Sequence, residues 1–245
     1  MKDNFSKQAG EYARYRPHYP PELFEFIIAH VTTLEVAWDC ATGNGQSALQ
    51  LARHFDKVFA TDISQEQLDA ATASEQVVYT RQPAEQTNFP DNYFDLITVS
   101  QALHWFNFDS FYSEVNRTGK PGSWLAVWMY SLLRITPEVD EIIERFHYQI
   151  LGEYWDQERG YVNSNYTTIP FPFAEIATPT FEMKFHWSLE ELEGYLTTWS
   201  ALQKFIGANN FNPVAGIIDE LRPHWKSSEM NIVFPLYLRM GKIEK

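Results

Sequence analysis

The chain has 245 residues, and its hydrophobic content of 44% is enough to bury one substantial core within a single domain. The 19 basic and 32 acidic residues give a net charge of −13, which disfavours a nucleic-acid partner because binding along its backbone means neutralising phosphates. A single cysteine, Cys40, excludes an intrachain disulfide and a cysteine-based metal cluster.

The opening segment MKDNFSKQAG lacks the apolar centre of a secretory signal, and no apolar run in the chain reaches the roughly 20 residues of a membrane span. We therefore expect a cytoplasmic protein with no membrane partner. Pro20 and Pro21 then open a predicted helix, which places Phe24, Ile27 and Val31 on one face.

The most informative stretch is Val36–Asp62. An apolar run ends at Asp39, a turn with Gly43 and Gly45 follows, and an amphipathic segment leads to a second strand that ends at Asp62. Glycines allow the backbone to turn tightly and to approach a ligand, and an acid at the end of the second strand can accept both ribose hydroxyls. A glycine pair alone could equally be a tight connection. Combined with the acid, it predicts a site for an adenosine-containing cofactor.

The turn does not fit the two common phosphate-binding patterns. A dinucleotide site would show a third glycine in G-x-G-x-x-G, and a P-loop would end in Gly-Lys-Ser/Thr; neither follows Gly45. The order acid-x-Ala-x-Gly-x-Gly, from Asp39 through Ala41 and Gly43, instead resembles motif I of the class I S-adenosylmethionine-dependent methyltransferases. That resemblance implies S-adenosylmethionine as cofactor and S-adenosylhomocysteine as product. It also implies that Asp39 is left free for the ammonium group of the methionine moiety.

The resemblance continues through the QALHWF element at 101–106 and the Lys-Pro-Gly turn at 120–122. QALHWF is similar to a small-molecule subgroup that includes the trans-aconitate methyltransferase relatives, as is the segment YARYRPHYP at 12–20. The implied fold is a doubly wound α/β domain with a mostly parallel, seven-stranded Rossmann-like sheet. The alternation of strands and helices predicts helices on both faces. A late strand is antiparallel, and a helical and aromatic insertion follows strand 5.

Two departures from family patterns bear on the site. Ala41 stands where most relatives have the first glycine of the turn, and it should be tolerated if φ is negative there. The Asn-Pro-Pro-aromatic motif of amino-directed base methyltransferases is absent after the fourth strand, where Ser100 and Gln101 stand. This favours an oxygen, carboxylate or carbon acceptor, or a small-molecule amine, over the amino group of a nucleobase.

Further cofactor-binding residues follow from the resemblance. Ile63 packs on the adenine face, and Ala84 and Glu85 lie at the adenine rim, with an exposed surface glutamate as the alternative for Glu85. Ser100 and Gln101 touch the methionine end of the cofactor through side chain or backbone.

The acceptor pocket is expected near the carboxyl end of the fourth strand. His104 lies there, and the ordinary histidine pKa of about 6.5 suits a general base, with a structural or substrate-orienting role as the alternative. Trp105 and Trp199 either line this pocket or belong to the core. Tyr15 and Arg16 resemble a cover over the methionine carboxylate, with an arm that merely packs on the body as the alternative.

The other histidines show no ligand spacing, so no metal site is expected. If the acceptor is a polycarboxylate, arginines should line its pocket. The candidates are Arg14, Arg16, Arg134 and Arg159.

The chain is predicted to form one methyltransferase domain over residues 1–245. It divides into an N-terminal arm and helix (1–35), a cofactor-binding core (36–130), an insertion that serves as a substrate lid (131–180), and C-terminal strands and helices (181–245). The lid interpretation depends on the aromatic side chains of the insertion, which are too numerous to leave exposed. A floppy surface excursion is the alternative.

Capping signals mark several helix starts. Ser64 with Gln67, and Ser188 with Glu191, predict capping boxes, and Asp109 is the predicted cap of a helix after QALHWF.

Two late strands have different patterns. Residues 181–187 alternate apolar and polar side chains, which is typical of a half-exposed strand near an edge. Residues 232–240 alternate too, and the resemblance places them inside the sheet, where Pro235 predicts a bulge.

The predicted function is methyl transfer from S-adenosylmethionine to a small-molecule acceptor, at an oxygen or a carboxylate. Two alternatives stay open: a non-catalytic protein that binds an adenosine cofactor, and an NAD-dependent oxidoreductase on a similar fold. The sequence does not specify an oligomeric state.

Overall fold

Eight strands form one sheet within residues 17–245, the part of the chain that the computed structural model describes. Tyr15 and Arg16 lie outside these residues. The strands are β1 (Val36–Cys40), β2 (Lys57–Asp62), β3 (Val77–Arg81), β4 (Phe94–Ser100), β5 (Gly119–Tyr130), β6 (Ala174–Glu175), β7 (Phe181–Trp187) and β8 (Met230–Lys242). Their order is β3-β2-β1-β4-β5-β8-β6, and β7 pairs with β8.

The sheet is parallel from β3 to β5, and β8 runs antiparallel to β5 on one side and to β7 on the other. The predicted α/β fold is therefore confirmed, including a late antiparallel strand inside the sheet. The eighth strand is the two-residue β6, which pairs with the far end of β8. β7 alternates buried and exposed side chains, as expected near an edge.

Pro235 lies in β8 without the predicted bulge. It faces Glu182 of β7 in an unbroken register. On its other side, the Pro235 carbonyl accepts the amide of Ser131 at 3.0 Å, one residue beyond the end of β5 at Tyr130. The amide and carbonyl of one strand residue point the same way, so the missing N–H falls where β5 has already ended. The bulge prediction was wrong because β5 ends before it would need a hydrogen bond from the N–H that proline lacks.

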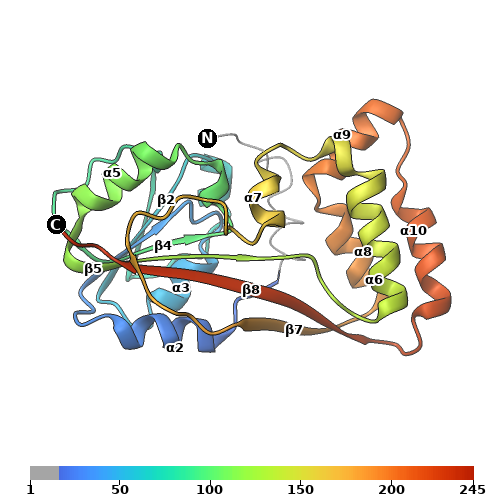
Figure 1. Cartoon of the computed structure of the whole chain (residues 1–245), viewed down its shortest axis with the longest axis horizontal. Coiled ribbons are helices and arrows are strands. Elements are labelled where there is room, and N and C mark those ends of the chain that lie inside the picture. Colours follow the sequence, from blue (N-terminus) through green and yellow to red (C-terminus); the bar gives the residue numbers. More distant parts are fainter. Residues whose placement is uncertain (1–16) are drawn as a thin grey trace.

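Helices cover both faces of the sheet and form a lobe beside it (Figure 1). The helices are α2 (Pro21–His30), α3 (Gln46–Leu51), α4 (Gln65–Asp69), α5 (Phe108–Thr118), α6 (Pro137–Glu144), α7 (Arg159–Asn163), α8 (Leu189–Thr197), α9 (Ser200–Asn209) and α10 (Val214–Leu221). Short 3-10 turns are η2 (Leu103–Trp105), η4 (Gly152–Tyr154) and η5 (Arg222–His224), and η3 (Arg145–Ile150) is a π-helix. The lobe of α6, α8, α9 and α10 lies beyond one end of the sheet, and β7 and β8 run toward it.

The core has two parts, one on each face of the sheet. In β1, Trp38 and Cys40 pack with Phe111 of α5, whereas Ala37 packs with α2 and α3. This alternation follows from the two-residue period of a strand. The larger part continues without a break into the helical lobe, so lobe and sheet share one apolar interior.

Most local start signals act as expected. The Ser64 side chain accepts the amide of Gln67, and Ser188 forms the full capping box. The predicted Asp109 cap was wrong: α5 begins at Phe108, and the Asn107 side chain accepts the Ser110 amide at 3.0 Å. Asparagine is an equally good cap, and its place two residues earlier is set by the end of η2.

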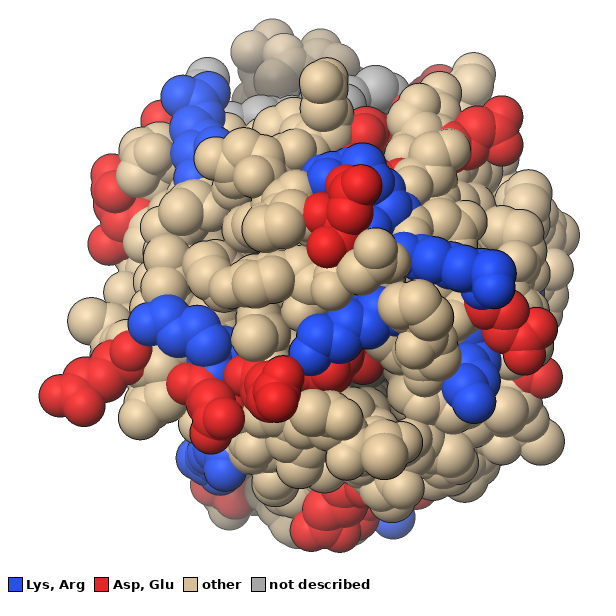
Figure 2. All heavy atoms as spheres, turned by 90° about the vertical axis from the view of Figure 1, so that its left-hand side faces the viewer, with Lys and Arg blue, Asp and Glu red and all other residues tan. Residues whose placement is uncertain are grey.

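Charges of both signs are mixed on the face drawn in Figure 2. Arg117 pairs with Asp91, and Lys120 pairs with Glu35 and Asp95. None of the helices described between residues 17 and 245 has both the length and the apolar character to cross a bilayer.

His147 is an unusual member of the core. It lies on the π-helix η3, is 1% exposed, stacks on Trp155 at 4.7 Å between ring centroids, and meets Trp199 edge-on at 5.3 Å. Neither ring nitrogen has a hydrogen-bond partner among the described residues. Burial, and then the charge of Arg159, lower the pKa of His147 to about 3.

Replacing His147 with Phe should stabilise the protein, and more at pH 5 than at pH 7. The change removes two buried nitrogens whose lack of partners costs about 1–3 kcal/mol. Because the folded pKa of about 3 lies below the reference value of 6.5, the wild-type protein loses stability as pH falls from 6.5 toward 3. At pH 5 this loss is about 2 kcal/mol. Urea denaturation at the two pH values measures the free energy of unfolding.

The exposed His54 provides the control, since His54→Gln removes an imidazole outside the core and should not reproduce the gain of His147→Phe. An equal gain for His147→Phe at both pH values would contradict the prediction.

Candidate active site

The turn after β1 depends on left-handed backbone conformations. Gly43 has φ of +58° and Gly45 has φ of +87°, which L-residues with side chains disfavour. A Cβ at Gly45 would also lie 2.3 Å from the hydroxyl of Tyr79. Gly45 is the N-cap of α3, so the glycine both turns the chain and starts the helix.

Ala41 belongs to the same turn and has φ of +53°. The condition under which alanine was expected to be tolerated here, a negative φ, is therefore not met. The Thr42 amide donates to the Thr61 carbonyl at 2.9 Å and ties the turn to β2, which holds Ala41 in a conformation that glycine would adopt without strain.

Asp62 joins the end of β2 to this turn. Its Oδ2 accepts the amide of Gly43 and its Oδ1 accepts the amide of Ser64, both at 2.9 Å. The carboxylate is 7% exposed and lies beside the glycine backbone.

Asp39 lies beneath the turn, with no exposed surface. Its carboxylate accepts the hydroxyl of Thr42 and, at 2.8 Å, that of Thr98. The carboxylate that was expected to stay free thus already accepts two hydroxyls, and its contact with the ammonium group of the cofactor stays a prediction. The β1–β2 register pairs Asp39 with Ala60, two residues before Asp62, so both acids face the same way. Burial raises the pKa of Asp39 to about 6, and the charge of Asp62 adds to this effect.

The residues expected around adenine lie at the ends of β2 and β3. Ile63 is half-buried, and its carbonyl accepts Nε of Arg81 at 2.8 Å. Ala84 belongs to the core under α5. Glu85 is half-buried, and its Oε1 accepts the amide of Asn107 at 3.2 Å.

The residues expected at the methionine end follow β4. The Ser100 hydroxyl accepts that of Ser47 at 3.2 Å. Gln101 has φ of +54°, and its side-chain amide pairs with the main chain of Tyr130, accepting the N–H at 2.9 Å and donating to the carbonyl at 3.3 Å. The Gln101 side chain thus continues the pairing of β4 with β5 where the backbone turns away.

A cavity of about 60 Å³ lies between this edge of the sheet and the helical lobe. The sheet side is lined by Gln101, His104, Trp105 and Tyr130. The other side is lined by Trp155, Asp156, Arg159, Tyr195, Trp199 and Ser200. All three residues predicted for the acceptor pocket therefore meet at one cavity.

Sequence reasoning missed four of the lining residues: Tyr130, Asp156, Tyr195 and Ser200. Tyr130 ends β5, so the rule that ligands bind at the carboxyl ends of parallel strands could have found it. Tyr195 and Ser200 come from α8 and α9 of the lobe, for which no local signal exists.

His104 is 5% exposed, and its Nδ1 lies 2.6 Å from the hydroxyl oxygen of Tyr166. Burial, and then the charge of Arg159, lower the pKa of His104 to about 3. The imidazole is therefore neutral at physiological pH. An ordinary histidine pKa was expected, and that expectation is corrected: a group with a pKa near 3 takes up a proton poorly at pH 7.

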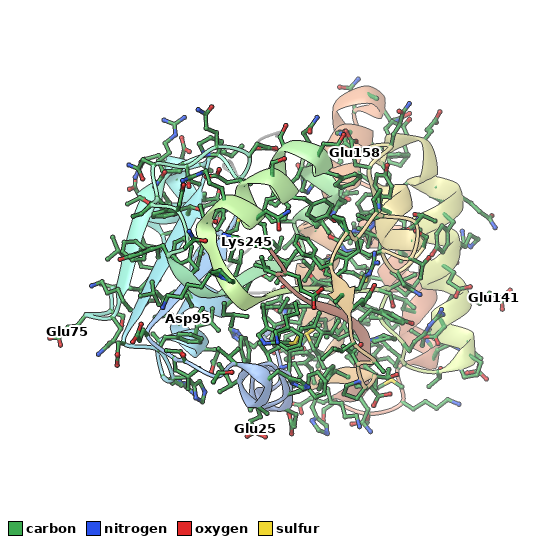
Figure 3. All side chains as sticks on the ribbon, turned by 60° about the vertical axis from the view of Figure 1, so that its left-hand side comes forward. Glu25, Glu75, Asp95, Glu141, Glu158 and Lys245 are labelled. Carbon is green, nitrogen blue, oxygen red and sulfur yellow. The ribbon has the colours of Figure 1, made fainter. Side chains whose placement is uncertain are left out.

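Arg159 supplies the positive charge of the cavity. It begins α7, and its guanidinium lies 4.7 Å from the centroid of the Trp155 ring. Asp156, the acid of the cavity, pairs with Lys204 at 2.6 Å. Glu158, which precedes Arg159, lies well away from Asp95 of β4 in the view of Figure 3.

Of the other candidate arginines, Arg134 pairs with Glu144 and Asp140. Arg14 and Arg16 lie outside the described residues. Within residues 17–245, no group of three or more His, Cys, Asp or Glu side chains is arranged to hold a metal ion.

Comparisons with known proteins agree with this geometry. Residues 38–127 match the family model described as a methyltransferase domain. A Dictyostelium discoideum protein named as a methyltransferase is 32% identical over 251 residues, which span 99% of this chain and 95% of the relative. A solved structure from Anaeromyxobacter dehalogenans, described as a type II methyltransferase, has a TM-score of 0.87 at 35% identity and covers 94% of this chain and 99% of that one.

The fold alone is shared with phosphoethanolamine N-methyltransferase 2 of Haemonchus contortus, solved with phosphomonomethylethanolamine and S-adenosylhomocysteine. That match has a TM-score of 0.51 at 14% identity, over 98% of this chain and 58% of that one.

The chain belongs to the class I S-adenosylmethionine-dependent methyltransferases. Membership of the trans-aconitate subgroup stays a prediction.

Replacing Ala41 with Gly should stabilise the protein by about 0.5–1 kcal/mol, because glycine adopts a positive φ without the strain that alanine carries. Urea denaturation measures the change. The matched control is Ala52→Gly, at a φ of −61°, which should lower stability by about 0.5 kcal/mol. A loss of stability in Ala41→Gly would show that the turn gains nothing from glycine.

Proposed function

We propose that this protein transfers a methyl group from S-adenosylmethionine to an oxygen or carboxylate of a small molecule. The observation that carries the proposal is the meeting of three features at the same edge of the sheet. These are the left-handed glycine turn after β1, the Asp62 carboxylate after β2, and the cavity after β4 and β5. The cofactor, when bound, supplies a methyl group activated on a sulfonium.

The donor set fits such a cofactor. Asp62 would accept the ribose hydroxyls, and the side-chain-free backbone of Gly43 would let the cofactor approach closely. Ile63, Ala84 and Glu85 would form the adenine rim. In this assignment Asp39 acts through Thr42, because its buried carboxylate positions the turn.

The methionine end would lie over the residues that follow β4. Ser100 and Gln101 are held there by Ser47 and by the main chain of Tyr130. Tyr15 and Arg16, which are proposed to cover the methionine carboxylate, lie outside the described residues.

The acceptor would enter the cavity between sheet and lobe. Trp105, Trp155 and Trp199 exclude water and limit the orientations of the acceptor, and alignment alone can lower the barrier by up to roughly 7–11 kcal/mol. Arg159 favours an anionic oxygen in the same space. The insertion at 131–180 provides Trp155 and Arg159, which supports its proposed role as a cover over the acceptor.

The function is tested first by calorimetry and then by transfer. The proposal expects S-adenosylhomocysteine to bind and NAD not to bind, and NAD binding alone would favour an oxidoreductase. Transfer is then measured with labelled S-adenosylmethionine on a panel of small carboxylic acids, phenols and amines. Binding without transfer to any member of the panel would favour a non-catalytic protein.

Replacing Asp62 with Asn should weaken S-adenosylhomocysteine binding by about 5–150-fold, because a charged acceptor for the ribose hydroxyls contributes about 1–3 kcal/mol. Asp95 gives the matched control. It is also a buried aspartate that accepts a main-chain amide, from Val36 at 2.9 Å, but it is the second residue of β4 and lies near the amino ends of the parallel strands. Asp95→Asn should lower stability and leave the dissociation constant unchanged. Equal affinities of Asp62→Asn and the wild type would reject the ribose assignment.

A further inference from the structure

His104 and Tyr166 form a buried pair at the wall of the acceptor cavity. Tyr166 comes from the insertion, 62 residues after His104, and is 1% exposed. The imidazole Nδ1 and the phenol oxygen are 2.6 Å apart, so one of the two groups must donate a hydrogen to the other. Which group donates decides the chemical character of His104.

The surroundings of the Tyr166 oxygen indicate the direction. Among the described residues, Nδ1 of His104 is the hydrogen-bond partner of this oxygen. Burial raises the pKa of Tyr166 far above its usual value, and the phenol therefore keeps its hydrogen. If Nδ1 donated instead, the buried hydroxyl hydrogen would be left without an acceptor, so this hydrogen points to Nδ1 of His104.

A neutral imidazole carries one hydrogen. If Nδ1 accepts the Tyr166 hydroxyl, that hydrogen is on Nε2. Nδ1 is turned to Tyr166, and Nε2 is the ring nitrogen left for the cavity that His104 lines. His104 then presents an N–H donor to the acceptor.

Tyr166 is held firmly in this position. It has φ of +59°, directly after Asn165 at +53°, and a bulky aromatic residue in the left-handed region is a genuine outlier. Its amide donates to Tyr161 at 2.8 Å, and its carbonyl accepts Arg239 of β8 at 2.9 Å. Arg239 is fixed in turn by a two-bond pair with Glu175. Backbone strain that the surrounding structure maintains in this way is typical of functional sites.

We propose that Tyr166 is a positioning residue that holds His104 as the Nε2–H tautomer, so that His104 is a hydrogen-bond donor to the acceptor and not its base. This inference rests on the proposed function, because it takes the cavity as the acceptor site. Nε2–H and the Arg159 guanidinium together would hold an oxygen that is already ionised when it binds. A carbon–oxygen bond then forms as the carbon–sulfur bond breaks, the sulfonium becomes a thioether, and no proton has to be removed.

The tautomer can be observed without any acceptor. The full chain, labelled with ¹⁵N in histidine, is examined by long-range proton–nitrogen NMR, with and without S-adenosylhomocysteine, and His104→Gln assigns the His104 signals by their absence. We expect a protonated Nε2 and an unprotonated Nδ1. Tyr166→Phe, which removes only the hydroxyl, should give a mixture of the two tautomers.

Tyr112→Phe is the matched control. The Tyr112 hydroxyl donates to the Pro170 carbonyl of the same insertion at 2.6 Å. Tyr112→Phe therefore also removes a half-buried hydrogen bond made by a tyrosine hydroxyl. This variant should keep the wild-type His104 spectrum. A hydrogen on Nδ1 in the wild-type protein, or an unchanged spectrum in Tyr166→Phe, would overturn the proposal.

Transfer to a carboxylic acid found active in the panel tests the role in catalysis. Glutamine retains an N–H donor near the place of Nε2 but cannot act as a base, whereas leucine retains neither property. His104→Gln should keep kcat/KM within about 10-fold of the wild type, and His104→Leu should lose about 100-fold or more, as expected for one or two lost hydrogen bonds to a charged group. Binding of S-adenosylhomocysteine by both variants shows that they fold. Equal and large losses in the two variants would support a base and contradict the donor role.

The binding and transfer assays test the proposed function, and the NMR measurement tests this inference separately. If S-adenosylhomocysteine does not bind, or no acid is methylated, the proposed function fails while the tautomer is still measured. If transfer occurs and the NMR shows the other tautomer, the function stands and the role of Tyr166 is rejected.

Discussion

The turn between β1 and α3 requires backbone conformations that ordinary residues disfavour, and two buried aspartates on neighbouring strands hold it there. Gly43 and Gly45 adopt positive φ, Asp62 accepts the amide of Gly43, and Asp39 accepts the hydroxyl of Thr42. The two carboxylates face the same way, so the charge of Asp62 adds to the burial that raises the pKa of Asp39. Left-handed backbone conformations and a buried carboxyl group with a raised pKa are thus concentrated in one turn. This pattern is expected where a ligand must approach the main chain.

The second half of the site is assembled from segments far apart in the chain. The Gln101 side chain pairs with Tyr130 and extends the contact of β4 with β5, which leaves η2 and His104 at the sheet edge. The opposite wall comes from the insertion and the helical lobe. Arg239 of β8 donates to the carbonyls of Tyr166 and Ile169 in the insertion. The last strand in the chain therefore also supports the cavity.

Several features of the fold followed from short stretches of sequence because their causes are local. The glycines of the turn, the acids that end two strands, the capping box at Ser188 and the alternation of β7 each depend on neighbours within a few residues. The features that the sequence did not predict had tertiary causes. Ala41 has a positive φ because a bond from Thr42 to β2 holds it there, and Pro235 needs no bulge because β5 stops beside it.

The sequence alone therefore determined the sheet, its glycine turn and the proximity of the residues predicted to bind the cofactor, since the carboxyl ends of parallel strands meet by rule at one edge. It also named His104, Trp105 and Trp199 for one pocket. Only the tertiary structure decided the protonation state and the hydrogen bonding of His104. Its pKa and its hydrogen-bond partner depend on Arg159 and Tyr166, which folding brings to it from the insertion, and burial among them removes the water that would give a histidine its ordinary properties.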